Sequence, residues 1–239
     1  MIKILAIGNS FSEDATRYLQ KISESAGEKL FIRNLYIGGC SLETHADNIK
    51  NESKAYVYQE DSAAICMASL NEALLFEKWD FVTVQQASHF SGKYETYEPY
   101  LSEIIDYVKG VLPNAKIVFH RTWPYEKNST HGAFPDYGCD RTKMYEAIVG
   151  ASAVAAESHG LDIIGVGDIV YALGETETFD KEKGGVSLYR DGFHLGLLYG
   201  RYLAGLVWFK FFTGKSVQSV TYLPDQADNE IIEILKKSV

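Results

Sequence analysis

The segment IKILAIGNSFS, residues 2–12, decides how this chain begins to fold. Its first six residues are almost entirely apolar, which predicts a buried strand. Gly8 interrupts this run, and apolar residues then recur at helical spacing from about residue 12 to residue 26. We therefore expect Ser10 to lie in the tight turn where a first strand passes into a first helix.

A serine in such a turn has two chemical advantages. The backbone N–H groups at the start of a helix are unpaired, and the helix dipole favours negative charge there. The hydroxyl could therefore attack a carbonyl carbon while nearby donors hold the oxyanion. The alternative is that Asn9 and Ser10 simply cap the helix, because Asn, Ser and Gly are frequent at helix starts. A matching base elsewhere in the chain is needed to decide between the two.

The whole chain predicts one domain over residues 1–239. A chain of 239 residues can bury a large core, and no Pro/Gly/Ser-rich linker, low-complexity segment or internal repeat divides it. Its hydrophobic fraction of 46% is ordinary for a globular protein. The formal net charge of −9 argues against a nucleic-acid partner, because a phosphate backbone attracts basic surfaces.

Cysteine and histidine usage excludes the common metal and disulfide frameworks. Cys40, Cys66 and Cys139 are odd in number and widely spaced, and the six histidines form no HExxH or HxH pair. Thiols without partners fit a reducing compartment, and no basic segment precedes an apolar one at the start of the sequence. We therefore expect a cytoplasmic protein, although a secreted chain without its signal peptide would look the same.

One apolar segment approaches the length of a membrane span. Residues 195–212 are rich in aromatic and aliphatic side chains, but Arg201 and Lys210 interrupt them. Charges inside a membrane are costly, so we expect a buried core helix and no membrane partner.

Strands and helices are expected to alternate along the chain. Strands are predicted at residues 29–37, 81–84, 115–119 and 161–166 in addition to the first, with helical periodicity between them. This alternation indicates an α/β fold with a parallel sheet. Ligands of such sheets bind outside the carboxyl ends of the strands. Several polar, glycine or aromatic residues follow predicted strand ends, namely Ser10, Gly39, Gln85, Gln86 and Trp123.

A candidate base for Ser10 lies far downstream. Asp191 and His194 are three residues apart, just before the last apolar helix, and this spacing lets the two side chains meet. A carboxylate on one ring nitrogen would leave the other free to accept the serine proton. The alternative is a surface acid and a helix-capping histidine, because a lone D-x-x-H motif is weak.

Taken in order, three segments resemble the SGNH (GDSL-type) hydrolases. GNSFS, residues 8–12, resembles the nucleophile block, IGGCS, residues 37–41, the oxyanion-glycine block, and DGFH, residues 191–194, the D-x-x-H block. The resemblance implies a three-layer α/β/α sandwich with about five parallel strands, and ester hydrolysis through an acyl-enzyme. It also implies Ser10 as nucleophile, His194 as base, Asp191 as its partner and Gly39 as an oxyanion donor, with no metal or organic cofactor.

The chain departs from the family pattern at two places. Asn9 stands where the family usually has Asp, and VQQASH, residues 84–89, stands where an asparagine-containing block is usual. The amide of Gln85, Gln86 or Asn9 could supply the missing donor. We favour Gln86 because it is nearer the loop, although both glutamines could equally be polar residues that close a strand. The departures indicate a divergent branch, nearer carbohydrate esterases.

Three further residues are candidates for substrate binding. His120 and Trp123 follow the fourth predicted strand, and Tyr137 lies in a long loop. Aromatic faces can stack on a sugar, but Trp123 could instead pack beneath its own loop. Neither His120 nor His131 has an acid at close spacing, so neither competes with His194 as the base.

The sequence thus predicts a serine esterase that acts on short acyl esters, most simply acetyl esters, of a carbohydrate or another small polar alcohol. Two alternatives remain. One is a lipid or thioester acyl hydrolase, which would need a long apolar groove. The other is a non-catalytic sugar-binding α/β module, and the lack of G-x-x-x-x-G-K-[ST] and G-x-G-x-x-G patterns argues against phosphate or dinucleotide binding.

Overall fold

The computed structural model covers residues 1–239 and is built on a seven-stranded sheet of order β4-β3-β2-β1-β5-β6-β7. Five of these strands are parallel to one another, and β3 and β4 form an antiparallel hairpin at one edge. The strands are β1 (Ile2–Gly8), β2 (Leu30–Tyr36), β3 (Tyr56–Glu60), β4 (Ala63–Ala68), β5 (Phe81–Val84), β6 (Lys116–His120) and β7 (Asp162–Ile164).

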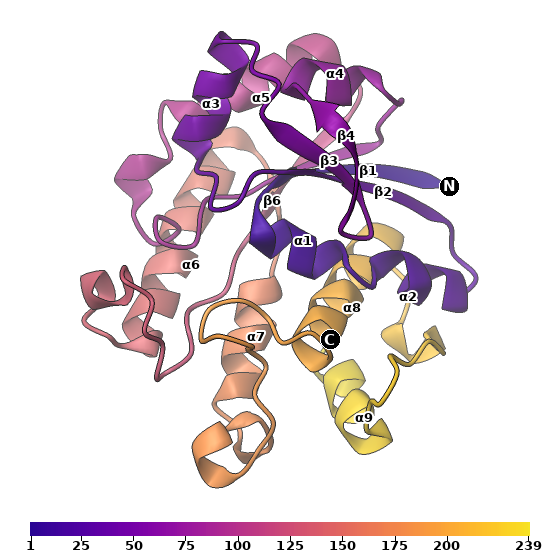
Figure 1. Ribbon diagram of the computed structural model, residues 1–239, viewed down its shortest axis with the longest axis vertical. Coiled ribbons are helices and arrows are strands. Elements are labelled where there is room, and N and C mark those ends of the chain that lie inside the picture. The colour runs from indigo at the N-terminus through magenta and orange to yellow at the C-terminus, as the bar shows by residue number, and fades with distance from the viewer.

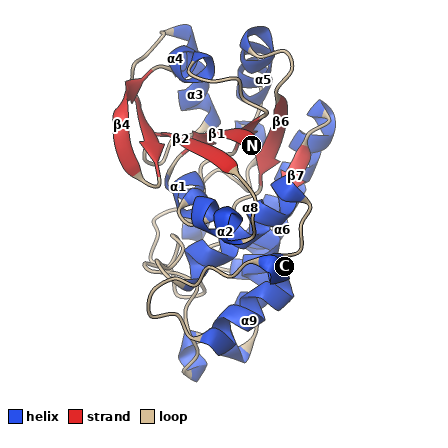
Figure 2. Cartoon of the chain, turned by 90° about the vertical axis from the view of Figure 1, so that its right-hand side faces the viewer, coloured by secondary structure: helices blue, strands red, loops and turns tan.

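Helices cover both faces of the sheet, as Figures 1 and 2 show. One layer contains α3 (Leu42–Lys50), α4 (Leu70–Leu75) and α5 (Tyr100–Val111), and the other contains α1 (Ser10–Thr16), α2 (Leu19–Ser25), α7 (Val166–Gly174), α8 (Tyr199–Thr213) and α9 (Asn229–Ser238). The long helix α6 (Arg141–His159) contributes buried residues to the cores on both faces. The predicted three-layer α/β/α sandwich with five parallel strands is confirmed.

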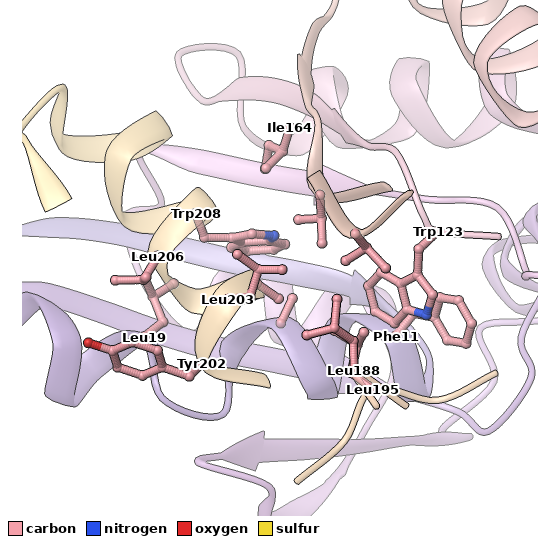
Figure 3. Close-up of a cluster of buried hydrophobic side chains, with 14 of the residues drawn as sticks. Phe11, Leu19, Trp123, Ile164, Leu188, Leu195, Tyr202, Leu203, Leu206 and Trp208 are labelled. Atoms are coloured by element: carbon pink, nitrogen blue, oxygen red, sulfur yellow. The ribbon is translucent and has the colours of Figure 1, made fainter. Parts of the chain in front are cut away.

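Alternation along β1 divides the interior into two cores. Ile4 and Ala6 point into the core beneath α1, α2 and α8, whereas Leu5 and Ile7 point into the core beneath α3, α4 and α5. All four are buried, as expected for the central strand of a sheet covered on both faces. Part of the first core is drawn in Figure 3, where aromatic and aliphatic side chains of α8 pack against residues of α1 and α2.

The first helix and the hairpin of β3 and β4 differ from the predictions. The single first helix is in fact two short helices, α1 and α2, with a break at Arg17 and Tyr18. Both pack on β2 and α8, so their apolar residues form one continuous stripe that looks like one helix in the sequence. The strand β4 was also missed, because its sequence AAICMA is mostly exposed and contains little of the β-branched pattern that marks strands.

The apolar segment near the C-terminus forms a core helix. Nine residues of α8 are buried, and the helix packs against α1, α2, α7 and α9. None of the helices combines the length and the apolar character that a membrane span requires.

Candidate active site

The turn between β1 and α1 holds Ser10 at the first position of a helix. Asn9 is the N-cap, and its Oδ1 accepts a hydrogen bond from the Phe11 N–H at 3.0 Å. Only glycine fits at position 8, because the Ser12 side chain packs against the backbone there and a Cβ would lie 2.5 Å from the Ser12 Oγ. The sequence therefore fixes the turn tightly, and Ser10 is left at its apex with its side chain free to reach across.

The structure brings together the three residues predicted to act as a unit. The Ser10 Oγ lies 2.8 Å from Nε2 of His194, and Nδ1 of the same ring lies 2.7 Å from Oδ2 of Asp191. Since a carboxylate accepts hydrogen bonds, Nδ1 carries a proton and Nε2 is the nitrogen that can accept the serine proton. An arrangement of this kind allows a hydroxyl to act as nucleophile, an imidazole as its base and a carboxylate to orient that base.

Asp191 is held ionised beside its histidine. Burial acts to raise the pKa of Asp191, but hydrogen bonds from the His194 ring and from the backbone N–H groups of His194 and Phe193 outweigh it and lower that pKa. The same N–H bonds, at 2.8 and 3.3 Å, close the turn between residues 191 and 194. One carboxylate thus shapes the turn and orients the imidazole that the turn carries.

A buried carboxylate connects this turn to α1, the helix that begins at Ser10. Asp14, one turn after Ser10 on α1, is 0% exposed. It accepts hydrogen bonds from Nη1 of Arg190 at 2.9 and 3.0 Å and from Nε of Arg201 at 2.7 Å. Its Oδ2 also accepts the Leu195 N–H at 3.0 Å. Asp14 therefore binds both chain segments that flank His194, and the sequence analysis did not identify it.

An aromatic stack supports the other side of the site. The rings of Phe11 and Trp123 are parallel, with centroids 4.2 Å apart. Figure 3 shows the two side chains next to each other. The Trp123 Nε1–H donates to the carbonyl oxygen of Phe193 at 2.8 Å. Residues next to Ser10 and next to His194 are therefore joined through one indole ring.

A cleft of about 240 Å³ opens above Ser10 and His194. It is lined by Asn9, Ser10, Phe11, Tyr36, Gly38, Gly39, Ser88, His89, His131, Phe193 and His194. Tyr36, Ser88, His89, His131 and Phe193 were not predicted as site residues. The rule that sites gather beyond strand ends could have indicated Tyr36, which ends β2, and Ser88 and His89, which follow β5 closely.

Two backbone N–H groups in the cleft lack partners. Gly39 has a φ of +65°, in the left-handed region that glycine adopts freely, and this conformation shapes the turn after β2. The N–H of Gly39 donates no hydrogen bond within the protein, and the N–H of Ser10, the first residue of α1, has no acceptor within its own helix. Unpaired donors beside a nucleophile are what an oxyanion requires.

The side-chain amides proposed as oxyanion donors are engaged elsewhere. The Gln86 Nε2 donates to the carbonyl and hydroxyl oxygens of Thr96 at 2.9 and 3.1 Å, so the preference for Gln86 is wrong. Its Oε1 accepts the N–H groups of Leu42 and Ala87. The residue joins the loops after β2 and β5 and does not line the cleft.

Gln85 and Asn9 support the turn from behind. The Gln85 Nε2 donates to Asn9 Oδ1 at 2.8 Å, and Nδ2 of Asn9 donates to the carbonyl oxygen of Cys40 at 3.0 Å. Gln85 is buried and absent from the cleft wall. The two amides position the loops that carry Ser10 and Gly39, which corrects the prediction that either one donates to substrate.

The three predicted substrate-binding residues are also outside the cleft. Trp123 and His120 are 0% exposed, so the interpretation of Trp123 as a packing residue was the right one. The Nδ1 of His120 lies 2.8 Å from Gln85 Oε1. The hydroxyl of Tyr137 accepts the Gly92 N–H and donates to the His89 carbonyl oxygen. Each of these side chains is packed inside the protein and stabilises the loops around the cleft. Burial of these rings in the core is more favourable than their exposure in the cleft.

Comparison with known proteins identifies the family. A family model described as a domain of unknown function, DUF4886, matches residues 3–239. The chain belongs to the DUF4886 family. A crystal structure of a DUF4886 protein from Bacteroides uniformis is 36% identical and superposes with a TM-score of 0.90, covering 99% of this chain and 92% of that one. No curated protein matches the sequence.

More distant structures share the fold of this DUF4886 chain. A candidate SGNH hydrolase from Slackia heliotrinireducens has a TM-score of 0.60 at 22% identity, over 88% of this chain and 98% of that one. A family 3 carbohydrate esterase from Clostridium thermocellum has a TM-score of 0.53 at 17% identity, over 87% and 94%. The DUF4886 domain therefore has an SGNH-hydrolase-like fold.

The DUF4886 domain has other and larger cavities, and one of them lies behind the Asp191–Gly192 turn. Its volume is about 370 Å³, and its wall is strongly charged, but neither Ser10 nor His194 lines it. Geometry therefore favours the smaller cleft as the reaction site. No three His, Cys, Asp or Glu side chains are grouped so that they could hold a metal ion.

Proposed function

We propose that this DUF4886 domain is a serine esterase that removes short acyl groups, most simply acetyl, from a carbohydrate or another small polar alcohol. The observation that carries the proposal is the continuous hydrogen-bond relay from Ser10 through His194 to Asp191, with distances of 2.8 and 2.7 Å. Such a relay is the requirement for activating a hydroxyl that is otherwise a weak nucleophile.

The reaction would proceed in two halves. The Ser10 Oγ attacks the ester carbonyl carbon as His194 Nε2 takes the hydroxyl proton, and Asp191 stabilises the resulting imidazolium. His194 then gives the proton to the leaving alcohol oxygen, and an acyl-enzyme remains. Water, deprotonated by His194, attacks the acyl carbonyl carbon; the bond to the Ser10 Oγ then breaks, the carboxylic acid leaves, and His194 returns the proton to Ser10.

The tetrahedral oxyanion would be held by backbone donors. The free N–H groups of Ser10 and Gly39 both belong to the cleft wall. A single donor of this kind is commonly worth about 3 kcal/mol of barrier. With Gln85 and Asn9 engaged in positioning, this site uses fewer side-chain donors than the family pattern implies, which supports its placement as a divergent SGNH branch.

The size and lining of the cleft support a small, polar substrate. A volume of about 240 Å³ is small for a ligand pocket, and only three of its eleven lining residues are hydrophobic. A long acyl chain would need an extended apolar groove. The carbohydrate esterase named among the fold relatives is consistent with a sugar ester, although that likeness is one of fold.

A fluorophosphonate probe tests the proposal. The wild-type protein should take up one probe, and mass mapping should place it on Ser10, because only a serine activated by a base reacts rapidly. Ser10→Ala should abolish labelling and lower kcat for p-nitrophenyl acetate roughly a thousandfold. Ser88→Ala removes another hydroxyl of the cleft and should still be labelled at Ser10.

Two other outcomes would contradict the proposal. A folded wild-type protein that takes up no probe would favour a non-catalytic sugar-binding module. A rate maximum at long chains, measured on p-nitrophenyl esters from acetate to decanoate, would favour the lipid or thioester hydrolase.

A further inference from the structure

His131 occupies a defined position on the cleft wall that the proposed mechanism does not use. Its ring lies between two aromatic rings, with centroids 4.6 Å from Tyr125 and 4.7 Å from Phe193. Tyr125 is fully buried, so this packing fixes the imidazole against the protein interior. His131 is nevertheless one of the residues that line the cleft.

The protonation of the His131 ring is determined by a backbone bond. The N–H of Ala133 donates to His131 Nδ1 at 3.1 Å. Because a backbone N–H can only donate, Nδ1 must be the acceptor, and the proton of the neutral ring is on Nε2. Burial is the main cause that lowers the pKa of His131; a positive charge on His194 would lower it further and Asp191 acts in the opposite direction, so the net lowering favours the neutral ring. The Nε2–H has no partner in the protein.

The position of His131 in the cleft places it near the alcohol part of a bound ester. The rings of His131, Phe193 and His194 follow one another, with centroid separations of 4.7 and 4.0 Å. His194 must face the leaving oxygen in order to protonate it. The alcohol part of a bound ester therefore extends along the His194 side of the cleft, where His131 lies.

A second neutral imidazole lines the same cleft. Burial is the main cause that lowers the pKa of His89; a positive charge on His131 or Lys93 would lower it further, and Asp136 acts in the opposite direction. The His89 ring makes no hydrogen bond within the protein and is packed on Phe90, with centroids 4.1 Å apart. Two uncharged rings, one of them a fixed donor, suit hydroxyl groups better than a charged or an aliphatic substituent.

We propose that His131 Nε2–H donates a hydrogen bond to a hydroxyl or ring oxygen of a sugar alcohol, next to the esterified position, and that His89 completes this alcohol subsite. The inference rests on the proposed esterase function and extends it, because it assigns the residues that recognise the alcohol. His131 is a specificity-determining residue here, since it contacts the substrate away from the reacting atoms.

Two substitutions separate the donor from the loop bond. Asn places an oxygen near the position of Nδ1, so His131→Asn can keep the bond from Ala133 and lacks the Nε2–H donor. Gln reaches the position of Nε2 with an N–H group, so His131→Gln keeps a donor. The substrates are a methyl glucoside that carries one acetyl group and cyclohexyl acetate, which has a six-membered ring and no hydroxyls.

The measured quantity is the ratio of kcat/KM for the two esters. We expect the wild type to prefer the sugar ester at least about tenfold, His131→Asn to lose about tenfold of that preference, and His131→Gln to retain most of it. Because the ratio is measured on one preparation, a partly unfolded variant does not alter it. His159→Gln, in a histidine paired with Glu98 outside the cleft, should leave the ratio at the wild-type value.

Three results would overturn the assignment. They are an equal loss on both esters in His131→Asn, an equal loss of preference in the Asn and Gln variants, and a wild type without preference for the sugar ester. A wild type that hydrolyses p-nitrophenyl acetate in any of these cases keeps the esterase proposal intact. Absence of hydrolysis of every ester would overturn the esterase proposal and the subsite with it.

Discussion

The backbone conformation of Gly39 sets the direction of its N–H group in the cleft, and the proposed reaction depends on that direction. Its φ of +65° costs an L-residue about 1–2 kcal/mol, and nothing lies within 4 Å of the place where a Cβ would stand. Gly39→Ala should therefore fold but relax away from the left-handed region and move its N–H. We expect kcat for p-nitrophenyl acetate to fall more than tenfold, because the displaced donor no longer meets the oxyanion.

Gly27 provides a matched control for this prediction. It has a φ of +76°, the space for a Cβ is equally open, and it lies in the turn before β2, outside the cleft. Gly27→Ala should show a similar loss in thermal midpoint and a wild-type kcat. Equal kcat values for the two variants would mean that the Gly39 N–H has no role in the reaction.

For single residues, the sequence predicted the positions of backbone features better than the directions of side chains. Ser10 and Gly39 could be placed because each follows a strand that is obvious from its composition. Gln86 could not, because β5 ends at Val84 and the alternation of a strand says nothing about residues beyond its end. Trp123 shows a second limit, since a large aromatic ring after a strand can face a cleft or the core, and here packing on Phe11 decides.

Among the elements, α1 and the turn before α8 depend on each other through Asp14. This carboxylate is buried between Arg190 and Arg201, and it also accepts the Leu195 N–H. Asp14→Asn should leave two partly buried guanidinium groups without their counter-charge and should destabilise the fold by about 3 kcal/mol. We expect kcat to fall about a hundredfold, because the turn that carries His194 moves relative to Ser10.

A substitution in the Arg121–Asp168 pair is the control that distinguishes a loss of stability from a loss of activity. Asp168 accepts two hydrogen bonds from Arg121, at 3.1 and 2.8 Å, and one from Tyr145, outside the cleft. Asp168→Asn should lower the urea midpoint and leave kcat near the wild-type value. If Asp14→Asn behaves in the same way, the buried network only stabilises the fold and does not position His194.

Helices and strands were predictable where the sequence showed both a hydrophobic periodicity and a residue that marks the end of the element. The strand β6 is preceded by Pro113 and Asn114, and α6 ends at Gly160 in the left-handed conformation, so both could be located. The hairpin of β3 and β4 gave neither signal, because Ala63–Ala68 is exposed and alternates weakly. The Asp14 network was invisible for another reason: its partners are 176 to 187 residues away in the sequence.

For the whole molecule, histidine burial couples folding to pH. Burial lowers the pKa of His45 and of His120 to about 3, and both side chains are almost completely buried. His89 and His131 also have a lowered pKa. Unfolding returns each imidazole to water, where its pKa is about 6.5. Between these values the unfolded chain binds more protons than the folded one, so stability must fall as pH decreases below about 6.5.

The contribution of His120 can be measured separately. One proton of difference changes the free energy of unfolding by about 1.4 kcal/mol per pH unit. His120→Asn keeps a donor near Gln85 Oε1 but has no titrating group. Urea unfolding between pH 4.5 and 6 should therefore give a slope that is smaller by about 1.4 kcal/mol per pH unit than the wild-type slope. This pH window lies above the range in which carboxyl groups with a lowered pKa, such as that of Asp191, take up protons.

The slope is the informative quantity because the substitution itself costs stability at every pH. His45→Asn tests the second buried imidazole in the same way, since its Nδ1 lies 2.9 Å from the Tyr56 hydroxyl and an amide can replace that contact. A wild-type slope in both variants would mean that these two rings are protonated in the folded protein, which their burial without a counter-charge opposes. The acid sensitivity would then have to come from His89 and His131, and their protonation would weaken the proposed alcohol subsite before it unfolds the protein.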